Sequence, residues 1–257
     1  MRKFLSVASL FALVLSACSN EASLGDEKGK GRVTINCVAE TTVDDFTRAN
    51  VSCTTPATED FALTIDGVSH TYTSSYASVT EFNESDIHLH YGSYKATVVA
   101  GNVTEEGYDK AAFVGVANFD IAARENTEVM ISAKIANTLV KVEVTDAFKA
   151  YFVGGHTLTL ATAAGNEFDV TAQSQPLFIA PATFTINGTA TKQPNQSGAE
   201  GTVVTLPEYK LEKPAAQTFY TVKFDVESAG STNLTITLND ILIESIEIEQ
   251  ELNDNAQ

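Results

Sequence analysis

The sequence predicts an all-β protein made of two tandem antiparallel β-sandwich domains, with one short helix at the start of the second. Apolar and polar residues alternate with period two in nearly every apolar run, which places one face of each strand on a core. The runs are rich in Thr, Val, Ile, Phe and Tyr, and turn residues separate them. The chain of 257 residues exceeds one typical domain, which favours two modest ones.

Residues 1–17 have the plan of an export signal and are excluded from the fold. Arg2 and Lys3 precede an apolar run from Phe4 to Leu15, and small residues follow. About a dozen apolar residues, at ~1.5 Å each in a helix, fall short of the ~30 Å hydrocarbon core of a bilayer. A permanent transmembrane helix is therefore the less favoured interpretation.

The end of this segment, LSAC at residues 15–18, resembles the bacterial lipobox, in which the cysteine receives a diacylglyceryl group before cleavage. Because two or more acyl chains give stable anchoring, we expect the mature protein to be attached to a membrane through Cys18. The alternative is an ordinary secretory signal with a chance cysteine. Residues 18–31 are small, polar and charged, which is typical of a flexible tether. We therefore expect a location in the cell envelope, at the outer membrane or cell surface.

The formal net charge of −17 argues against two classes of partner. Nucleic acids and anionic lipid head groups are bound mainly by basic residues that displace counterions, so we expect no nucleic-acid partner. The acidity itself is adequately explained as a device that keeps a surface protein soluble.

The first predicted domain covers residues 32–136, and its strands follow from four alternating faces. The expected buried sets are Val33, Ile35 and Cys37; Phe61, Leu63 and Ile65; Ile87, Leu89 and Tyr91; Tyr94, Ala96 and Val98; and a further set, Val129, Ile131, Ala133 and Ile135, before the boundary. The boundary is placed at residues 136–138, between two adjacent strand patterns.

The second predicted domain covers residues 137–250. Its buried sets are Val140, Val142 and Val144; Tyr220, Val222, Phe224 and Val226; and Leu234, Ile236 and Leu238. The short helix is expected after a cap at Thr145 or Asp146, with Phe148, Tyr151 and Phe152 on one face and Gly154 and Gly155 at its end. Residues 234–238 and 241–248 are expected to form a final hairpin, with a bulge near Glu244 and Ser245.

After lipidation two cysteines remain, Cys37 and Cys53, and an oxidising envelope permits a disulfide between them. The alternative is that Cys37, which continues the face of Val33 and Ile35, is simply a small buried residue. The residues leave both interpretations open.

Four segments carry a resemblance to a known family: LHYGSYKATVVAG, AAFVGVANFDI, NTEVMISAKIANTLVKVEVTDAFKAYF and TFYTVKFDV. They resemble a lipoprotein domain family of gut Bacteroidetes whose function is unknown, and they are distantly similar to fimbrillins, the subunits of lipoprotein-derived surface pili. The similarity extends from about residue 32 to residue 249. It implies two transthyretin-like sandwiches, a structural or adhesive role, and pilin-like subunits or host or bacterial surface proteins as partners.

The fimbrillin resemblance also implies proteolytic processing after an arginine near the first strand. By position Arg48, in FTRANVS, resembles that site, and Arg32 is the second candidate. Removal of a strand leaves unpaired backbone groups beside an apolar slot, which an added strand from a neighbour satisfies. The simpler interpretation of Arg48 is a solvated side chain in a polar loop. A Cys37–Cys53 bridge would hold the cut strand in place.

No catalytic signature appears, so we expect a protein that is not an enzyme and needs no cofactor. His88 and His90 project from one face of a strand, yet no further ligand accompanies them, and we expect no metal site. Asn83, Glu84 and Asp86 lack the ordered spacing of a calcium loop.

Glycan capture is the alternative function for a surface lipoprotein of this kind. Sugar sites use exposed aromatic rings, and the chain has no tryptophan. The tyrosines that could replace it are Tyr72, Tyr76, Tyr91, Tyr108 and Tyr209.

Overall fold

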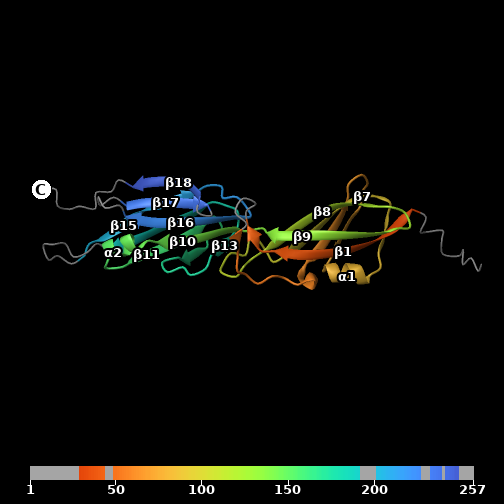
Figure 1. Ribbon diagram of the computed structural model, residues 1–257, viewed down its shortest axis with the longest axis horizontal. Helices are drawn as coiled ribbons and strands as arrows, with labels where there is room; N and C mark the ends of the chain where they lie inside the picture. The colour runs from red at the N-terminus through yellow and green to blue at the C-terminus, as the bar shows by residue number, and fades with distance from the viewer. Residues whose placement is uncertain (1–28, 44–48, 192–200, 227–231, 239–240, 249–257) are drawn as a thin grey trace, which may run out of the picture.

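The computed structural model describes residues 29–43, 49–191, 201–226, 232–238 and 241–248. These residues form an elongated molecule in which two groups of strands follow one another along the long axis (Figure 1). We call the described residues up to Ala136 the N-terminal unit and those from Asn137 the C-terminal unit. Both consist mainly of strands, which confirms the predicted all-β class.

The N-terminal unit contains one seven-stranded sheet. Its order is β5 (Thr73–Tyr76), β4 (Ala62–Gly67), β7 (Gly92–Ala100), β8 (Phe113–Ile121), β9 (Asn126–Ile135), β1 (Lys30–Glu40) and β6 (His88–His90). Two short strands, β2 (Thr42–Val43) and β3 (Ala49–Asn50), pair separately, and the helical segments are η1 (Thr58–Asp60) and α1 (Val79–Glu84). Strand β1 begins at Lys30, inside the predicted tether.

This sheet folds over at the corner between β8 and β9. These strands pair only through Phe113 with Ile135 and Val114 with Lys134, whereas β7–β8 and β1–β9 pair along their length. A Cβ atom on Gly115 would lie 2.9 Å from the Cα of Ala133, so β9 crosses close to the inner face of β8. The two halves of the sheet thereby enclose one core, as in a sandwich.

The C-terminal unit contains two sheets that share a second core. One has the order β13 (Leu177–Ile179), β10 (Thr138–Val144), β16 (Thr218–Val226), β17 (Thr232–Leu238) and β18 (Ile241–Ile248). The other has the order β12 (Glu167–Asp169), β11 (His156–Thr162), β14 (Phe184–Thr191) and β15 (Val203–Leu211). Helix α2 (Asp146–Tyr151) follows β10.

The two units repeat one strand plan. The half-sheet order β5-β4-β7-β8 corresponds to β12-β11-β14-β15, and β9-β1-β6 corresponds to β16-β10-β13. In both, the first strand lies parallel to the last strand of the shared plan: β1 to β9 and β10 to β16. The prediction of purely antiparallel sheets is wrong for these two pairs, because period-two alternation reports burial and not strand direction. The hairpin β17–β18 is an addition to the C-terminal unit.

Most of the predicted buried faces are confirmed. Val33, Ile35 and Cys37 are buried, as are the sets of β4, β7 and β9. The prediction that Tyr91 is buried is wrong. Its side chain is 69% exposed, because β6 ends at His90 and the chain then turns through Gly92, whose φ is +145°. The predicted residues of the final hairpin form β17 and β18, with a register shift opposite Ile236 and Thr237.

The second unit has its predicted helix, and the first has one that the sequence did not predict. Thr145 Oγ1 caps α2 by accepting the N–H of Phe148 at 3.1 Å, and Phe148 and Phe152 are buried. In α1, Ser78 Oγ accepts the N–H of Glu81 and the Glu81 carboxylate accepts the N–H of Ala77. This closely resembles a capping box, so the serine-x-x-glutamate spacing was the available signal.

Candidate functional site

Two of the predicted site residues, Cys18 and Arg48, lie outside the described residues. Arg48 belongs to segment 44–48, between the paired strands β2 and β3. Strand β2 directly precedes this segment, and the long strand before it, β1, lies between β9 and β6 with its alternate side chains in the core.

Strand β1 is paired on its β6 side only at its first residues, Lys30 to Arg32. Further along, the side-chain amide of Asn83 in α1 replaces a strand partner. The N–H of Ile35 donates to Asn83 Oδ1 at 3.0 Å, and Asn83 Nδ2 donates to the Ile35 carbonyl at 2.7 Å. The amide satisfies backbone groups that a sheet edge would otherwise leave unpaired.

The C-terminal unit contains the same device on the equivalent strand. Where the pairing of β10 with β13 ends at Val140, the amide of Gln173 bonds to the backbone of β10. The N–H of Val142 donates to Gln173 Oε1 at 2.6 Å, and Gln173 Nε2 donates to the Val140 carbonyl at 2.9 Å. In each unit, a side-chain amide therefore bonds to backbone groups of the first strand where its short neighbouring strand, β6 or β13, ends.

Cys37 and Cys53 are free thiols, Cys37 buried and Cys53 half-buried. Both pack into the core of the N-terminal unit. Burial raises the pKa of the Cys37 thiol, and burial together with the carboxylate of Asp109 raises the pKa of Cys53. Neither sulfur therefore has the lowered pKa that is typical of a reactive cysteine. Their disulfide remains a prediction.

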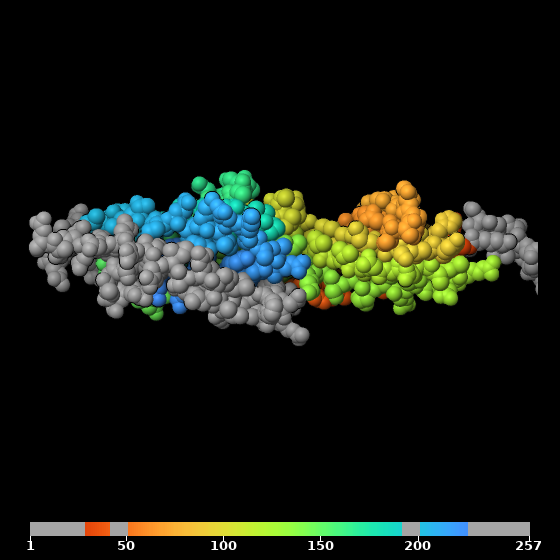
Figure 2. Space-filling view, turned by 90° about the horizontal axis from the view of Figure 1, so that it is seen from above, coloured from red at the N-terminus to blue at the C-terminus, as the bar shows by residue number. Residues whose placement is uncertain are grey.

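The connection between β7 and β8, residues 101–112, fastens the N-terminal unit to the C-terminal unit. Gly107 pairs with Phe178 of β13: the N–H of Gly107 donates to the Phe178 carbonyl at 2.9 Å and the reverse bond is 3.1 Å. Phe178 and Leu139 are buried in the core of the N-terminal unit. We call this contact the seam. Figure 2 shows the waist of the molecule, where segment 101–112 in yellow meets the C-terminal unit.

The carboxylate of Glu106 is the polar centre of the seam. It accepts hydrogen bonds from Thr162 Oγ1 at 2.6 Å, Asn166 Nδ2 at 2.8 Å and the Ala180 N–H at 3.0 Å. All three donors belong to the C-terminal unit. The neighbouring Glu105 instead pairs with Lys110 at 3.3 Å, within the same loop and in solvent.

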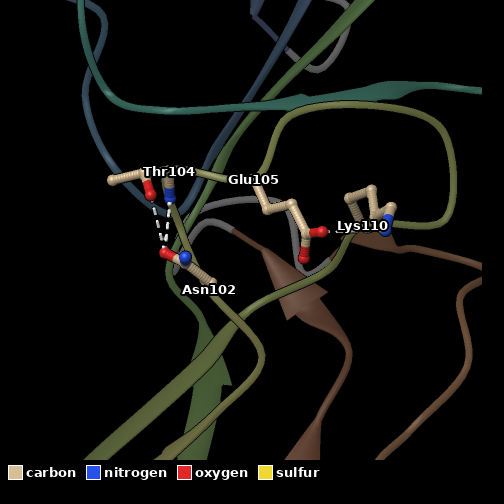
Figure 3. Close-up of polar contacts among 4 residues, drawn as sticks. All are labelled: Asn102, Thr104, Glu105 and Lys110. Carbon is tan, nitrogen blue, oxygen red and sulfur yellow. Dashed lines mark hydrogen bonds and ion pairs between the residues drawn. The ribbon is translucent and has the colours of Figure 1, made fainter.

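Hydrogen bonds within segment 101–112 fix the start of the loop, before the residues that form the seam. Asn102 Oδ1 accepts the N–H of Thr104 at 3.0 Å and its hydroxyl at 2.8 Å, in an Asx-type turn (Figure 3). Figure 3 also shows the Glu105–Lys110 pair across the loop. These contacts lie on either side of Glu106 and Gly107, the two residues that bond to the C-terminal unit.

The outer faces of the N-terminal unit carry isolated apolar side chains. On β1 and β9, Val38 is 53% exposed and Met130 is 64% exposed. Met130 pairs with Asn36 and Val38 pairs with Ser132, so the two apolar side chains are diagonal neighbours on adjacent strands. The two side chains therefore form a small exposed apolar pair on this face.

The histidines and tyrosines singled out in the sequence fall into different environments. His88 is half-buried and His90 exposed on β6, and no group of three or more metal-ligating side chains occurs within the described part of the chain. Tyr209 is buried, whereas Tyr72, Tyr76 and Tyr108 are half-buried. Only Tyr91 in that set presents a largely exposed ring.

These features define a class: a two-unit β-sandwich protein whose units are joined at the seam by backbone and side-chain hydrogen bonds. A model of the family described as "Domain of unknown function (DUF4493)" matches residues 29–254. The chain belongs to that family. In the described residues no helix is long and apolar enough to cross a membrane.

Several solved structures of bacterial proteins are similar to the chain. One is a candidate cell adhesion protein from Bacteroides eggerthii, at 10% identity and TM-score 0.44, covering 82% of this chain and 95% of that one. Another is the fimbrial anchor protein Mfa2 of Porphyromonas gingivalis, at 10% identity and TM-score 0.41, covering 84% and 100%. A third is a candidate polysaccharide binding protein from Bacteroides thetaiotaomicron, at 9% identity and TM-score 0.37, covering 87% and 99%. No curated protein matches the sequence.

Proposed function

We propose that the chain is a cell-envelope lipoprotein that acts as a fimbrillin-like structural or adhesion module through protein–protein contacts. The seam is the observation that carries this proposal. Backbone pairing of Gly107 with Phe178 and the three bonds of Glu106 join two sandwiches into one rod. A rod of this kind transmits a contact made at one end to an anchor at the other, which a freely hinged pair of domains does not.

The anchor is the lipid on Cys18. We expect the protein purified from cells to begin at Cys18 with an acyl modification, which intact-mass analysis of the N-terminal peptide will detect. An unmodified N-terminus elsewhere in the chain would overturn the anchoring step. Exposure on the cell is tested separately by protease treatment of intact cells, followed by mapping of the released peptides.

Processing at Arg48 is a separate part of the proposal. A cut there would detach the anchored segment together with β1, whose Val33, Ile35 and Cys37 lie in the core. The vacated position would expose the edge of β9 and an apolar slot, which an added strand fills. An Arg48→Ala variant should keep its anchored form in cells, whereas the wild-type protein should also appear as a form that begins at Ala49. An intact chain through Arg48 in the mature wild-type protein excludes this step.

The predicted Cys37–Cys53 bridge determines what such a cut does. If the bridge forms in the envelope, β1 stays attached after cleavage, and release then requires reduction. Thiol labelling of the unfolded protein, before and after reduction, measures the bridge directly. Labelling of both cysteines without a reductant would exclude it.

Contact with partner proteins is assigned to the outer face of β1 and β9. Lysine at Val38 and Met130 should reduce in-cell cross-linking to neighbouring proteins, because the substitutions place charges on the exposed apolar pair. Val203→Lys is the matched control, since Val203 has similar exposure but lies in β15. Equal cross-linking by the double variant and the control would contradict the assignment.

Glycan capture is the second candidate, and the exposed ring of Tyr91 favours it. A glycan array with wild-type protein and Tyr91→Ala provides the test. Selective binding that is lost in the variant would favour glycan capture over assembly.

A further inference from the structure

The outer end of the N-terminal unit contains a pocket of about 310 Å³ at the point where the chain enters the fold. Its lining includes Lys30, Arg32, His88, Arg124 and Glu125. Arg32 and Arg124 are two of only four arginines in a chain of net charge −17. This cluster of basic residues makes the outer end of the molecule locally more positive than the net charge of the chain suggests.

The fold brings these residues together from three strands. Arg32 of β1 is in register with His88 of β6 on one side and with Asn126 of β9 on the other. The turn before β9 is bonded to the start of β1: the Arg124 N–H donates to the Lys30 carbonyl at 2.7 Å, and the Arg32 N–H donates to the Glu125 carbonyl at 2.9 Å. Backbone bonds therefore hold Lys30, Arg32 and Arg124 around one opening.

The backbone of Arg124 is independent support for a functional side chain there. Its φ is +65°, in the left-handed region where glycine and asparagine are favoured and arginine is strained. Backbone strain of this kind concentrates at functional sites, and it persists where the surrounding structure holds the residue in place. A turn whose purpose was merely geometric would be better served by glycine.

The charges of the pocket are only partly neutralised. Arg32 forms an ion pair with Asp86, with 3.0 Å between guanidinium nitrogen and carboxylate oxygen. Among the residues that the structure describes, neither Lys30 nor Arg124 forms an ion pair, and Glu125 is the one acidic side chain in the lining. An anion entering the opening therefore meets two cationic groups that need no prior separation from a partner.

The exposed ring of Tyr91 lies beside this opening. Its N–H donates to the Gly29 carbonyl at 2.6 Å, and the ring lies next to Gly29. Tyrosine next to Lys and Arg is typical of protein surfaces at a membrane interface, where the ring sits at the level of the head groups.

We propose that this pocket binds the phosphate group of an anionic lipid head group in the membrane to which the chain is anchored. The inference rests on the proposed lipid at Cys18, which lies eleven residues before Gly29 and so within roughly 35–40 Å of it along an extended chain. The net charge disfavours anionic membranes for the surface as a whole. The pocket overcomes this locally, because Arg and phosphate form charge-assisted, paired hydrogen bonds. Binding would orient the long axis of the rod away from the membrane.

The test uses the chain from residue 18 to residue 257 with Cys18→Ser, so that no acyl group contributes to binding. Sedimentation with vesicles of phosphatidylcholine is compared with vesicles that also contain phosphatidic acid. Titration with inorganic phosphate in a calorimeter distinguishes a free phosphate from a head group. Arg124→Gln removes the guanidinium and keeps a side chain in the left-handed position, while Lys149→Gln in α2 makes the same charge change in the other unit.

We expect the wild-type chain and Lys149→Gln to bind the phosphatidic acid vesicles, and Arg124→Gln to bind them on the order of tenfold more weakly. Arg32→Gln should weaken binding in the same direction. An equal loss of vesicle binding in Lys149→Gln would overturn the proposed binding site, because it would show that only the overall charge of the protein matters. Binding of inorganic phosphate without vesicle binding would overturn the lipid source and retain an anion site. The Cys18→Ser chain carries no lipid, so a failure to bind vesicles would say nothing about the anchor. Mass analysis of Cys18 in the natural protein tests the anchor independently.

Discussion

Asn83 and Ile35, which lie 48 positions apart in the sequence, are joined by two hydrogen bonds between a side-chain amide and a strand backbone. The pair links α1 to β1 and closes the part of β1 that β6 does not reach. It also ties an interior strand to a helix and not only to its sheet. The stability of β1 is therefore sensitive to one amide.

Asn83→Ala should lower the free energy of unfolding by about 1–3 kcal/mol, because it leaves the N–H and carbonyl of Ile35 without partners. Urea unfolding will measure this as a lower midpoint at an unchanged slope. Asn118→Ala, on the exposed face of β8, is the control and should stay within about 0.5 kcal/mol of wild type. An equal effect of the two substitutions would show that the amide pair is not stabilising.

Glu106→Ala should loosen the seam and cost about 2 kcal/mol, since three donors of the C-terminal unit lose a charged acceptor. We expect one thermal unfolding transition to separate into two in the variant, measured by calorimetry. Glu105→Ala removes only a solvent-exposed ion pair and should change stability by no more than about 0.5 kcal/mol. A single transition for Glu106→Ala at the wild-type temperature would contradict the role of the seam.

Arg124→Gly and Arg124→Val remove the same charge but should act on stability in opposite directions. Glycine relieves the left-handed strain at a smaller entropic cost, so we expect a gain of about 0.5 kcal/mol. Valine is β-branched and poorly tolerated at positive φ, so we expect a loss of at least about 1 kcal/mol. Chemical denaturation of both variants measures the difference. Equal stabilities would mean that the turn relaxes and that no strain is stored there.

Tyr76 should make the protein less stable at alkaline pH. Burial, followed by the hydrogen bond with Tyr72, raises the pKa of Tyr76 to about 12 from its ordinary value of 10.0. Because the folded pKa is raised, the stabilising contribution is complete below pH 10.0 and is lost as the pH rises toward about 12, where the unfolded chain ionises first. The difference in stability between wild type and Tyr76→Phe, measured across this range, should shrink as the pH rises. A difference that is independent of pH would exclude the ionisation of Tyr76 as the cause.

The alternation of side chains was sufficient to predict which residues form the cores. Ile35 and Ile131, for example, lie on predicted faces and are buried. Alternation could not predict that β1 pairs with β9, because the pattern of each strand is the same whatever its neighbour and direction. It also failed at Tyr91, where the pattern continued past the end of β6.

The pocket at the outer end could not be predicted from the sequence for the same reason. Lys30 and Arg32 meet Arg124 only because the first strand lies parallel to the last, and no local signal records that contact. The bonds from the side-chain amides of Asn83 and Gln173 to strand backbones could not be predicted either, since both residues lie in polar stretches where such side chains are common. Glu106 differs from Glu105 only through the fold that surrounds it.

The parallel pairing of first and last strands has a consequence for how the chain matures. In each unit the earliest strand to emerge during synthesis has to wait for a much later one, because β1 pairs with β9, and β10 with β16, only after the intervening segments have appeared. Contacts so distant in sequence carry a large loop-closure cost and slow the folding of β proteins. A nascent molecule therefore carries an unpaired leading strand until its later strands appear, and during that interval chaperones, proteases or neighbouring copies can reach it.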